Sequence, residues 1–571
     1  MEPEPLKTEP PEHEPAALPT LPPRYYLDNF QRLREAVEAR YGDLLNAGER
    51  AVLAAFDALP APARCLYLRL LSRVGPWFRA SRLDYAEIGP PGPALDALVD
   101  AGLAVELDAL PVAELGRLFT RPEIAALYAA ALPGAARLAK GPLLEAVAAL
   151  GEDDEARWAR LQAQAPERVV APLALEVLEV LQLLFFGNRR QGLVDFVLSD
   201  LGVARYYPYA LDRETRLFRD RDALEAVRAV GELSDLYWQW REDPELDPGV
   251  LPALAEATLA LEVRGDAAQR SWWRLLNRLG RDCERQGAGD VALALYAASG
   301  RHPARERRAR VLEAGGEEAA ALGAVEAMLA APWCEAEAAA AERMARRLRR
   351  RVHGRPQPRP RDHFPVAGLT VTRVTGSVER DSAAALEARD GRPVFYLENA
   401  LFTGLFGLAF WEELFAPVPG AFHHPYQAGP ADAFSASFRE RRRDAIDRRL
   451  EALAAADLPT LLAGAFRRYR GYQCHWVDWR AIDEALVRRA ARCIPFDHLA
   501  GTWERLLFDP ADNRRGFPDL VALGEAPGDY ALYEVKGPGD ALQEHQRRWL
   551  NHFAGLGMPA SVLQVSWADD G

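Results

Sequence analysis

Three charged side chains near the end of the chain have the types and spacing that phosphodiester hydrolysis requires. Asp519 follows Pro518, and Glu534 and Lys536 follow further along in the string EVK. A pair of carboxylates binds Mg²⁺ or Mn²⁺, which prefer oxygen ligands, and such a metal polarises a phosphate and helps to generate hydroxide from water. A lysine beside them orients or deprotonates that water and offsets charge in the transition state. These residues therefore predict a metal-dependent phosphodiesterase site.

The elements that position these residues are predicted to be two strands of a β-hairpin. DLVAL and YALYEVK are apolar runs of strand length, and GEAPGD between them is a turn signal rich in Gly and Pro. Because side chains alternate faces along a strand, Glu534 and Lys536 project from the same face. Asp519 begins the partner strand, so the hairpin brings its carboxylate back beside Glu534. The alternative is a surface hairpin with an ordinary ion pair, since short ExK strings also occur by chance.

Lysine usage and the following glycines favour the functional interpretation. Of 70 basic residues only three are lysine, namely Lys7, Lys140 and Lys536, and the rest are arginine. A guanidinium is effectively always protonated and cannot act as a base, so a lysine at 536 indicates a task that arginine would not fulfil. Gly537 and Gly539 follow directly and permit close approach of the backbone to a ligand.

A helix is predicted to begin at Asp540, with Gln543 three residues later in the manner of a capping box. Its core-facing stripe consists of Leu542, Trp549, Leu550 and Phe553. Gln546 lies on or beside that stripe near the start of the helix, where its amide would bond the attacking water or a phosphate. The alternative role is a satisfied polar residue at the edge of the core.

The composition is that of a soluble globular protein with several domains. Apolar residues make up 49% and charged residues 27% of 571 positions, which is ordinary for that class, and single cores rarely exceed ~250–300 residues. No window approaches the ~20 uncharged apolar residues that span a bilayer, and the N-terminal segment, which has no basic stretch followed by an apolar one, is not expected to be a signal peptide. The five cysteines form no CxxC pair, which predicts neither a disulfide framework nor a cysteine zinc site and fits a reducing cytoplasm. The net charge of −13 argues weakly against a protein coated in nucleic acid, but the location of positive charge matters more than the total.

Four segments are predicted along the chain. Residues 1–23 read as a disordered acidic, Pro-rich tail. Residues 24–200 alternate short helices with a wing-like extended piece, PWFRASRLDYAEI, and predict a winged-helix-like DNA-binding region. Residues 201–362 show paired helical segments, which predict tetratricopeptide-like stacking. In residues 363–571 strands return, and FYLENALFTGLFGLAFWEELF predicts one long apolar helix before the hairpin.

Arginines are expected to supply the contacts to DNA, because the chain has almost no other cations. The candidates are Arg69, Arg73, Arg79 and Arg82 in the N-terminal region and Arg514 and Arg515 just before the hairpin. Each of them could equally be a salt-bridged surface residue. Binding through such contacts should weaken steeply with salt.

The segment PDL…EVKGPGDALQEHQRRWL closely resembles the virus-type replication-repair nuclease (VRR-NUC) domain, a branch of the PD-(D/E)xK superfamily. Other stretches, among them RYYLDNFQRLREAVEARYGDLL and LENALFTGLFGLAFWEELF, resemble Fanconi-associated nuclease and its bacterial relatives. The resemblance implies a mainly α, multidomain chain with a winged-helix/SAP-like region, a tetratricopeptide-like block and an α/β nuclease domain. It also implies a structure-specific nuclease that cuts 5′ flaps, degrades DNA 5′→3′ and acts in interstrand cross-link repair.

The resemblance also assigns site residues. The catalytic positions of the family fall on Asp519, Glu534 and Lys536, and the backbone carbonyl of Val535 is implied as a further metal ligand. A fourth acidic ligand from a helix before the hairpin matches Glu398 best. Without the resemblance, a glutamate there would be an exposed charge favoured by the helix dipole.

One departure from the eukaryotic relatives concerns recruitment and source. No cysteine lies in the first 60 residues, so the zinc-type ubiquitin-binding finger of the longer eukaryotic proteins has no counterpart. The short form fits a bacterial enzyme, cytoplasmic and associated with the nucleoid.

Two other functions stay open at this point. The first is a Holliday-junction or restriction-like endonuclease, although the long series of domains before the nuclease favours a single asymmetric, branched double-stranded DNA substrate such as a 5′ flap. The second is a helical-repeat scaffold with a vestigial nuclease, against which the intact set of Asp519, Glu534 and Lys536 argues. The oligomeric state is left undetermined by the sequence.

Overall fold

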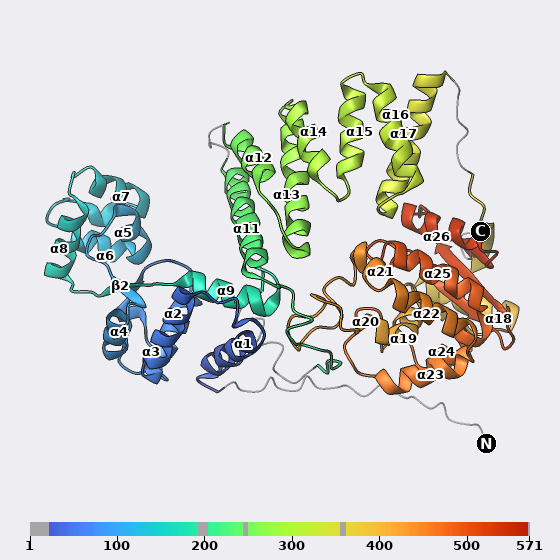
Figure 1. Ribbon diagram of the computed structural model, residues 1–571, viewed down its shortest axis with the longest axis horizontal. Helices are drawn as coiled ribbons and strands as arrows, with labels where there is room; N and C mark the ends of the chain where they lie inside the picture. The colour runs from blue at the N-terminus through green and yellow to red at the C-terminus, as the bar shows by residue number, and fades with distance from the viewer. Residues whose placement is uncertain (1–21, 192–203, 244–248, 355–360, 569–571) are drawn as a thin grey trace. The chain divides into compact units, whose positions relative to one another are not determined.

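The computed structural model describes residues 22–191, 204–243, 249–354 and 361–568, and the chain divides into two compact units, residues 1–203 and 204–571 (Figure 1). The predicted acidic tail therefore lies almost wholly outside the described residues. None of the helices in the described ranges is long and apolar enough to cross a membrane.

The first unit consists mainly of short helices. They are α1 (Tyr25–Tyr41), α2 (Ala47–Ala58), α3 (Ala61–Leu71), α4 (Pro91–Asp100), α5 (Val112–Leu118), α6 (Arg121–Leu127), α7 (Lys140–Ala148), α8 (Asp154–Gln164) and α9 (Leu175–Phe186), with single turns at η1 (Ala80–Arg82) and η2 (Ala135–Arg137). The start of α2 shows why such short helices form: the Asn46 side chain accepts the Glu49 N–H at 2.8 Å, and Glu49 accepts the Asn46 N–H at 2.9 Å. Each of these bonds satisfies an amide that the helix itself leaves free.

The extended piece predicted as a wing becomes part of a small sheet. Its strand β1 (Phe78–Arg79) pairs antiparallel with β3 (Val169–Pro172), which also pairs with β2 (Ala104–Glu106). Within the described residues the order is β1-β3-β2. The central strand comes from far along the chain, and no local pattern showed that pairing.

The second unit contains the helical block, whose members stand side by side in Figure 1. They are α11 (Arg221–Glu242), α12 (Val250–Ala260), α13 (Asp266–Arg285), α14 (Gly289–Ala298), α15 (Ala304–Ala314), α16 (Glu318–Ala330) and α17 (Glu335–His353). From α12 onward each helix packs against the next. Ala292, Ala304, Ala309 and Ala321 are completely buried, and their small side chains let neighbouring backbones approach closely. The predicted stacking of paired helices is confirmed.

Residues at the start of α17 attach the helical block to the nuclease part. The Glu335 N–H donates to Asp509 at 3.0 Å, its carboxylate lies 2.9 Å from the Arg505 guanidinium, and Asn513 donates to it at 3.2 Å. Because Glu335 and Asn513 are buried, these bonds fix the two parts of the second unit to each other at this point.

The nuclease part is built on a mixed sheet of five strands within the described residues. They are β4 (Val366–Val371), β5 (Val394–Tyr396), β6 (Leu520–Leu523), β7 (Tyr530–Lys536) and β8 (Ala560–Trp567), in the order β4-β8-β7-β6-β5. The pair β6–β7 is antiparallel and β7–β8 is parallel, so the predicted hairpin is confirmed. Two helices accompany the sheet in sequence, α18 (Val378–Asp390) before β5 and α26 (Glu544–Gly555) between β7 and β8.

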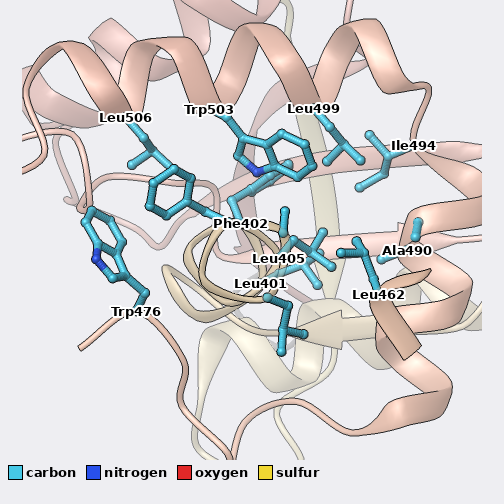
Figure 2. Packing of buried hydrophobic residues seen from close by; sticks show 14 of the residues in the cluster. Leu401, Phe402, Leu405, Leu462, Trp476, Ala490, Ile494, Leu499, Trp503 and Leu506 are labelled. Carbon is cyan, nitrogen blue, oxygen red and sulfur yellow. The ribbon is translucent and has the colours of Figure 1, made fainter. Parts of the chain in front are cut away.

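The remaining helices enclose the main hydrophobic core. They are α19 (Ala400–Ala409), α20 (Trp411–Leu414), α21 (Ser437–Arg441), α22 (Arg443–Ala454), α23 (Leu458–Tyr469), α24 (Glu484–Cys493) and α25 (Phe496–Phe508). Figure 2 shows Phe402 and Leu405 of α19 among Leu462, Trp503 and other side chains of the surrounding helices, all of which are buried. Burial of each large side chain of this kind contributes about 1.5–3 kcal/mol, so α19 is firmly anchored.

The prediction of one long apolar helix over FYLENALFTGLFGLAFWEELF is wrong. Phe395 and Tyr396 lie in β5 and pair with β6, Glu398 lies in the turn that follows, and the helix is interrupted at Phe410 between α19 and α20. A continuous apolar run fits a buried helix and a buried strand equally well, and here pairing with the distant β6 decided in favour of a strand.

Candidate active site

Glu534 and Lys536 project from the same face of β7, as the alternation of the strand predicted. The Lys536 Nζ lies 2.8 Å from Glu534 Oε1, and the lysine side chain is 13% exposed while the glutamate is completely buried. The pair is thus a largely buried ion pair. It is not the exposed surface pair that was the alternative.

Asp519 is held beside them by its own backbone and by its side chain. Its Oδ2 accepts the backbone N–H of Val535 at 2.8 Å, a bond that crosses the hairpin. Its carbonyl oxygen accepts the N–H groups of Leu397 at 3.0 Å and Glu398 at 3.1 Å. The structure therefore brings the predicted trio together at one end of the hairpin.

The electrostatics of the site show a deficit of positive charge. Burial and, after it, the charge of Asp519 raise the pKa of Glu534 to about 8, against the opposing effect of Lys536. Burial likewise raises the pKa of Asp519. Lys536 forms an ion pair with Glu534, but neither Glu534 oxygen has a hydrogen-bond partner among the described residues. Such orphaned buried carboxylate oxygens are costly unless a cation meets them.

The donor set fits a hard divalent cation of the Mg²⁺ type. Mg²⁺ is usually held by one or two carboxylates, with waters and substrate phosphate oxygens completing its octahedron, and Asp519 and Glu534 provide those carboxylates. The described part of the chain contains no group of three or more His, Cys, Asp or Glu side chains arranged to hold a metal ion together. A cation held by Asp519 and Glu534 would therefore need further oxygen ligands to complete its shell.

Glu398 is close to the pair but bonded elsewhere. It lies in the turn between β5 and α19 with φ of +42°, and its carboxylate accepts the hydroxyl of Tyr396. That hydrogen bond, together with burial, raises the pKa of the Tyr396 phenol. Glu398 is one of the charges that raise the pKa of Asp519, after the larger effect of burial, so its carboxylate is near the site without forming a three-carboxylate cluster.

Glu379 is a carboxylate near the site that the sequence did not single out. It lies in the first turn of α18 and accepts the Ser377 hydroxyl at 2.7 Å. Its charge adds to that of Glu398 in raising the pKa of both Asp519 and Tyr396, beyond the leading effects of burial and of the Tyr396–Glu398 bond. In the sequence, the only signal was a serine cap followed by acidic residues, which marks any helix start.

The helix that carries Gln546 begins later than predicted. It starts at Glu544 with Gln543 as its cap, and Gln546 Oε1 accepts the Gln543 N–H at 2.9 Å. Asp540 accepts the Gly537 N–H at 3.1 Å, because a short Asp side chain bonds readily to nearby backbone and closes a turn. Gln546 is thus part of a capping box, and its amide nitrogen is the group left to face water or phosphate.

A groove of about 790 Å³ opens beside Glu398. Its lining includes Tyr396, His475, Trp479, Arg480, Arg514 and Arg515. The Arg514 guanidinium lies 4.1 Å above the Phe434 ring, and Arg515 is exposed. Cations together with aromatic faces suit phosphates and unstacked bases.

The four arginines predicted in the N-terminal unit differ in their contacts. Arg79 lies 2.8 Å from Glu123 and 2.9 Å from Glu167, with only 13% of its side chain exposed. Arg69 pairs with Glu87 at 2.7 Å and lies 4.1 Å above the Tyr26 ring.

Arg82 and Arg73 are more accessible. Arg82 is 63% exposed and lies 3.6 Å from Glu123. Arg73 is exposed and donates to the Tyr85 hydroxyl at 3.0 Å. Arg69 and Arg79 therefore join structural ion pairs, whereas Arg73 and Arg82 are accessible to solvent.

An N-terminal and a C-terminal segment of the chain match known protein families, and nearly the whole chain matches known proteins. Residues 24–105 match the family described as "FAN1, HTH domain" and residues 456–567 match the VRR-NUC domain. The Fanconi-associated nuclease 1 homolog of Pseudomonas aeruginosa is 36% identical over 97% of this chain and 98% of its own. The Arabidopsis thaliana homolog is 25% identical over 95% of this chain and 67% of its own.

The resemblance extends to solved structures. A crystal structure of paFAN1 bound to DNA with a gap and a 2-nucleotide 5′ flap has a TM-score of 0.80 and 34% identity, over 96% of this chain and 99% of that one. A second complex, with a 1-nucleotide flap, has a TM-score of 0.78. The identity over the full length, the two matched domains and the site at the hairpin agree: the chain belongs to the Fanconi-associated nuclease family.

Proposed function

We propose that this protein is a structure-specific, metal-dependent DNA nuclease that cuts 5′ flaps and then degrades DNA 5′→3′. The observation that carries the proposal is the completely buried Glu534 carboxylate, which has no hydrogen-bond partner among the described residues and lies beside Asp519 and Lys536. The membership of the family and the binding of 5′-flap DNA by paFAN1 support the choice of substrate.

The residues of the site divide the work of hydrolysis. When bound, Mg²⁺ or Mn²⁺ supplies Lewis-acid polarisation of the scissile phosphate. Asp519 and Glu534 provide carboxylate ligands for it, with the Val535 carbonyl and Glu398 as further ligands. Lys536 holds or deprotonates the attacking water and offsets charge on the phosphate, and the Gln546 amide bonds that water or a phosphate oxygen.

DNA is held, in this proposal, by several parts of the chain. Residues 24–200 bind the duplex, residues 201–362 form the helical connector and residues 363–571 cut. Arg73, Arg82, Arg514 and Arg515 are the phosphate contacts that their exposure or position supports, whereas Arg69 and Arg79 stabilise the fold. The biological role is interstrand cross-link repair on nucleoid DNA in a bacterial cytoplasm, without recruitment by ubiquitin.

A cleavage assay tests the proposal. The full-length protein is incubated with end-labelled 5′-flap, 3′-flap, fork and four-way DNA in Mg²⁺, Mn²⁺ or EDTA, next to an Asp519→Asn variant. We expect metal-dependent cuts near the 5′-flap junction, and none by the variant, which should still bind DNA. Paired symmetric cuts in the four-way DNA would instead indicate a junction resolvase. An absence of cleavage on every substrate would indicate a scaffold with a vestigial nuclease.

A further inference from the structure

Asn399 connects the two backbone segments that carry the acidic residues of the site. It follows Glu398 directly, and its side-chain Oδ1 accepts the N–H groups of Gly516 at 2.9 Å and Phe517 at 3.3 Å. Asp519 lies two residues beyond Phe517. One amide side chain thus fixes the segment that leads into Asp519.

Backbone bonds run in the opposite direction between the same segments. Leu397 and Glu398 donate their N–H groups to the Asp519 carbonyl at 3.0 and 3.1 Å. Together with the Asn399 bonds they close a ring that holds residues 397–399 against residues 516–519. Glu398 has a φ of +42°, a left-handed conformation that is unfavourable for a non-glycine residue. It persists only where surrounding bonds over-determine it, and this ring supplies such bonds.

Both sides of the ring are anchored in packed structure. Asn399 directly precedes α19, whose side chains are buried in the main core (Figure 2). On the other side, the centroid of the Phe517 side-chain aromatic group lies 5.1 Å from that of Phe402 and 4.2 Å from that of Trp549. A Cβ on Gly516 would meet His545 Cδ2 at 2.4 Å, so this glycine lies directly against the start of α26. The ring is therefore a rigid frame around the acidic residues.

We propose that Asn399 is a positioning residue that sets the separation of Glu398 from Asp519 and thereby the divalent-cation affinity of the site. The inference rests on the proposed function, because it assigns Glu398 and Asp519 to one metal centre. Without the Asn399 acceptor, Gly516 and Phe517 lose their bonds, and the turn at Glu398 is free to relax out of its left-handed conformation. Partners of metal ligands typically contribute 10–100-fold to metal affinity, and that is the effect expected here.

Binding of Mn²⁺ to the full-length protein without DNA provides the test, since it is measured by the loss of the free-ion EPR signal and needs no cleavage. Asn399→Ala and the isosteric Asn399→Leu should weaken Mn²⁺ binding roughly 10–100-fold, and Asn399→Asp, which keeps the acceptor oxygen, should restore it to within a few-fold. Asn399→Ser is the substitute if the first two do not fold. Asn551→Ala is the matched control, because it removes a side chain that bonds His363 and Asp362 in the same domain. It should leave Mn²⁺ affinity unchanged.

A double substitution separates positioning from general loosening. In a Glu398→Gln background, Asn399→Ala should weaken Mn²⁺ binding less than it does alone, because part of its effect acts through Glu398. Unchanged Mn²⁺ affinity in folded Asn399→Ala, Leu or Ser protein overturns the inference, as does an undiminished effect in the Glu398→Gln background. If Asp519→Asn also bound Mn²⁺ like the unaltered protein, the proposed metal site itself would be wrong.

Discussion

The ammonium group of Lys536 and the carboxylate of Glu534 lie 2.8 Å apart on one face of β7, and the carboxylate is completely buried. A buried carboxylate near a single lysine and a second carboxylate, Asp519, is poorly compensated, which is why burial raises its pKa to about 8. This relationship links stability to function. The poorly compensated carboxylates destabilise the free protein, and they are the groups that a bound cation would neutralise, while Lys536 would meet the phosphate.

Replacing Lys536 by arginine tests whether the lysine contributes more than its positive charge. We expect Lys536→Arg to reduce cleavage of 5′-flap DNA by about 100-fold or more, because loss of acid–base catalysis costs 10²–10⁴-fold and a guanidinium stays protonated. DNA affinity should change little. Lys140→Arg, at the start of α7, is the matched control and should cleave normally. Normal cleavage by Lys536→Arg would show that charge alone suffices.

Neutralising Glu534 should separate stability from activity. Glu534→Gln removes a buried carboxyl group whose charged form is poorly compensated and which has no hydrogen-bond partner among the described residues, so Tm should stay level or rise while cleavage falls on the order of 10³-fold. Asp381 offers a contrast, because it accepts N–H groups from Val374 at 3.1 Å and Thr375 at 2.9 Å. Asp381→Asn should lower Tm. Differential scanning calorimetry measures both, and a marked drop in Tm for Glu534→Gln would contradict the electrostatic account.

Gly516 should tolerate no side chain. Its φ is +89°, and an added Cβ would lie 2.4 Å from His545 Cδ2 and 3.0 Å from the His545 carbonyl carbon. We expect Gly516→Ala to destabilise the protein by about 2–4 kcal/mol, from overpacking and backbone strain together. Gly528 in the hairpin turn has a φ of +83° with open space around it, so Gly528→Ala should cost only about 1 kcal/mol. Equal costs in urea unfolding would mean that the contact with α26 is unimportant.

Arginines of the N-terminal unit should divide into two groups. The double variant Arg73→Ala/Arg82→Ala should weaken DNA binding and lower the dependence of log K on log salt by up to about 2, with Tm unchanged. Arg79→Ala should instead lower Tm, because it leaves the carboxylates of Glu123 and Glu167 without this partner. Fluorescence anisotropy across a salt series checks the first group. If the double variant bound with an unaltered salt slope, these residues would not contact phosphates.

The helical block should lose local stability in acid. Arg347 bonds the Glu313 carboxylate at 2.8 Å through Nε, which lowers the pKa of Glu313 below its ordinary value of 4.5. Since the folded pKa is the lower one, the stabilisation is fully present above about pH 4.5 and is lost as pH falls through the folded pKa. Hydrogen exchange in α15 and α17 should be faster in Glu313→Gln than in the unaltered protein at pH 7. The difference should shrink in acid, and a constant difference would exclude this linkage.

Local patterns in the sequence were sufficient for the centre of the site. The alternation in YALYEVK placed Glu534 and Lys536 on one face, and the glycines and proline of GEAPGD predicted the turn that returns Asp519 to them. Both signals act over a few residues, and the structure agrees with them. The start of α26 was predicted wrongly at Asp540. A short acidic side chain that caps a helix cannot be distinguished by residue type from one that closes a turn, and Asp540 closes a turn.

Tertiary structure alone decided the features that depend on distant partners. The turn at Glu398 exists because β5 pairs with β6, more than a hundred positions along the chain, and Asn399 reaches Gly516 across the same distance. Glu379 became a neighbour of the site only when α18 was placed beside the sheet, and Arg79 became a structural residue only when Glu123 and Glu167 reached it. The sequence by itself determined which chemistry the chain carries, since residue type and short-range alternation set that; packing between distant segments decided which charges meet.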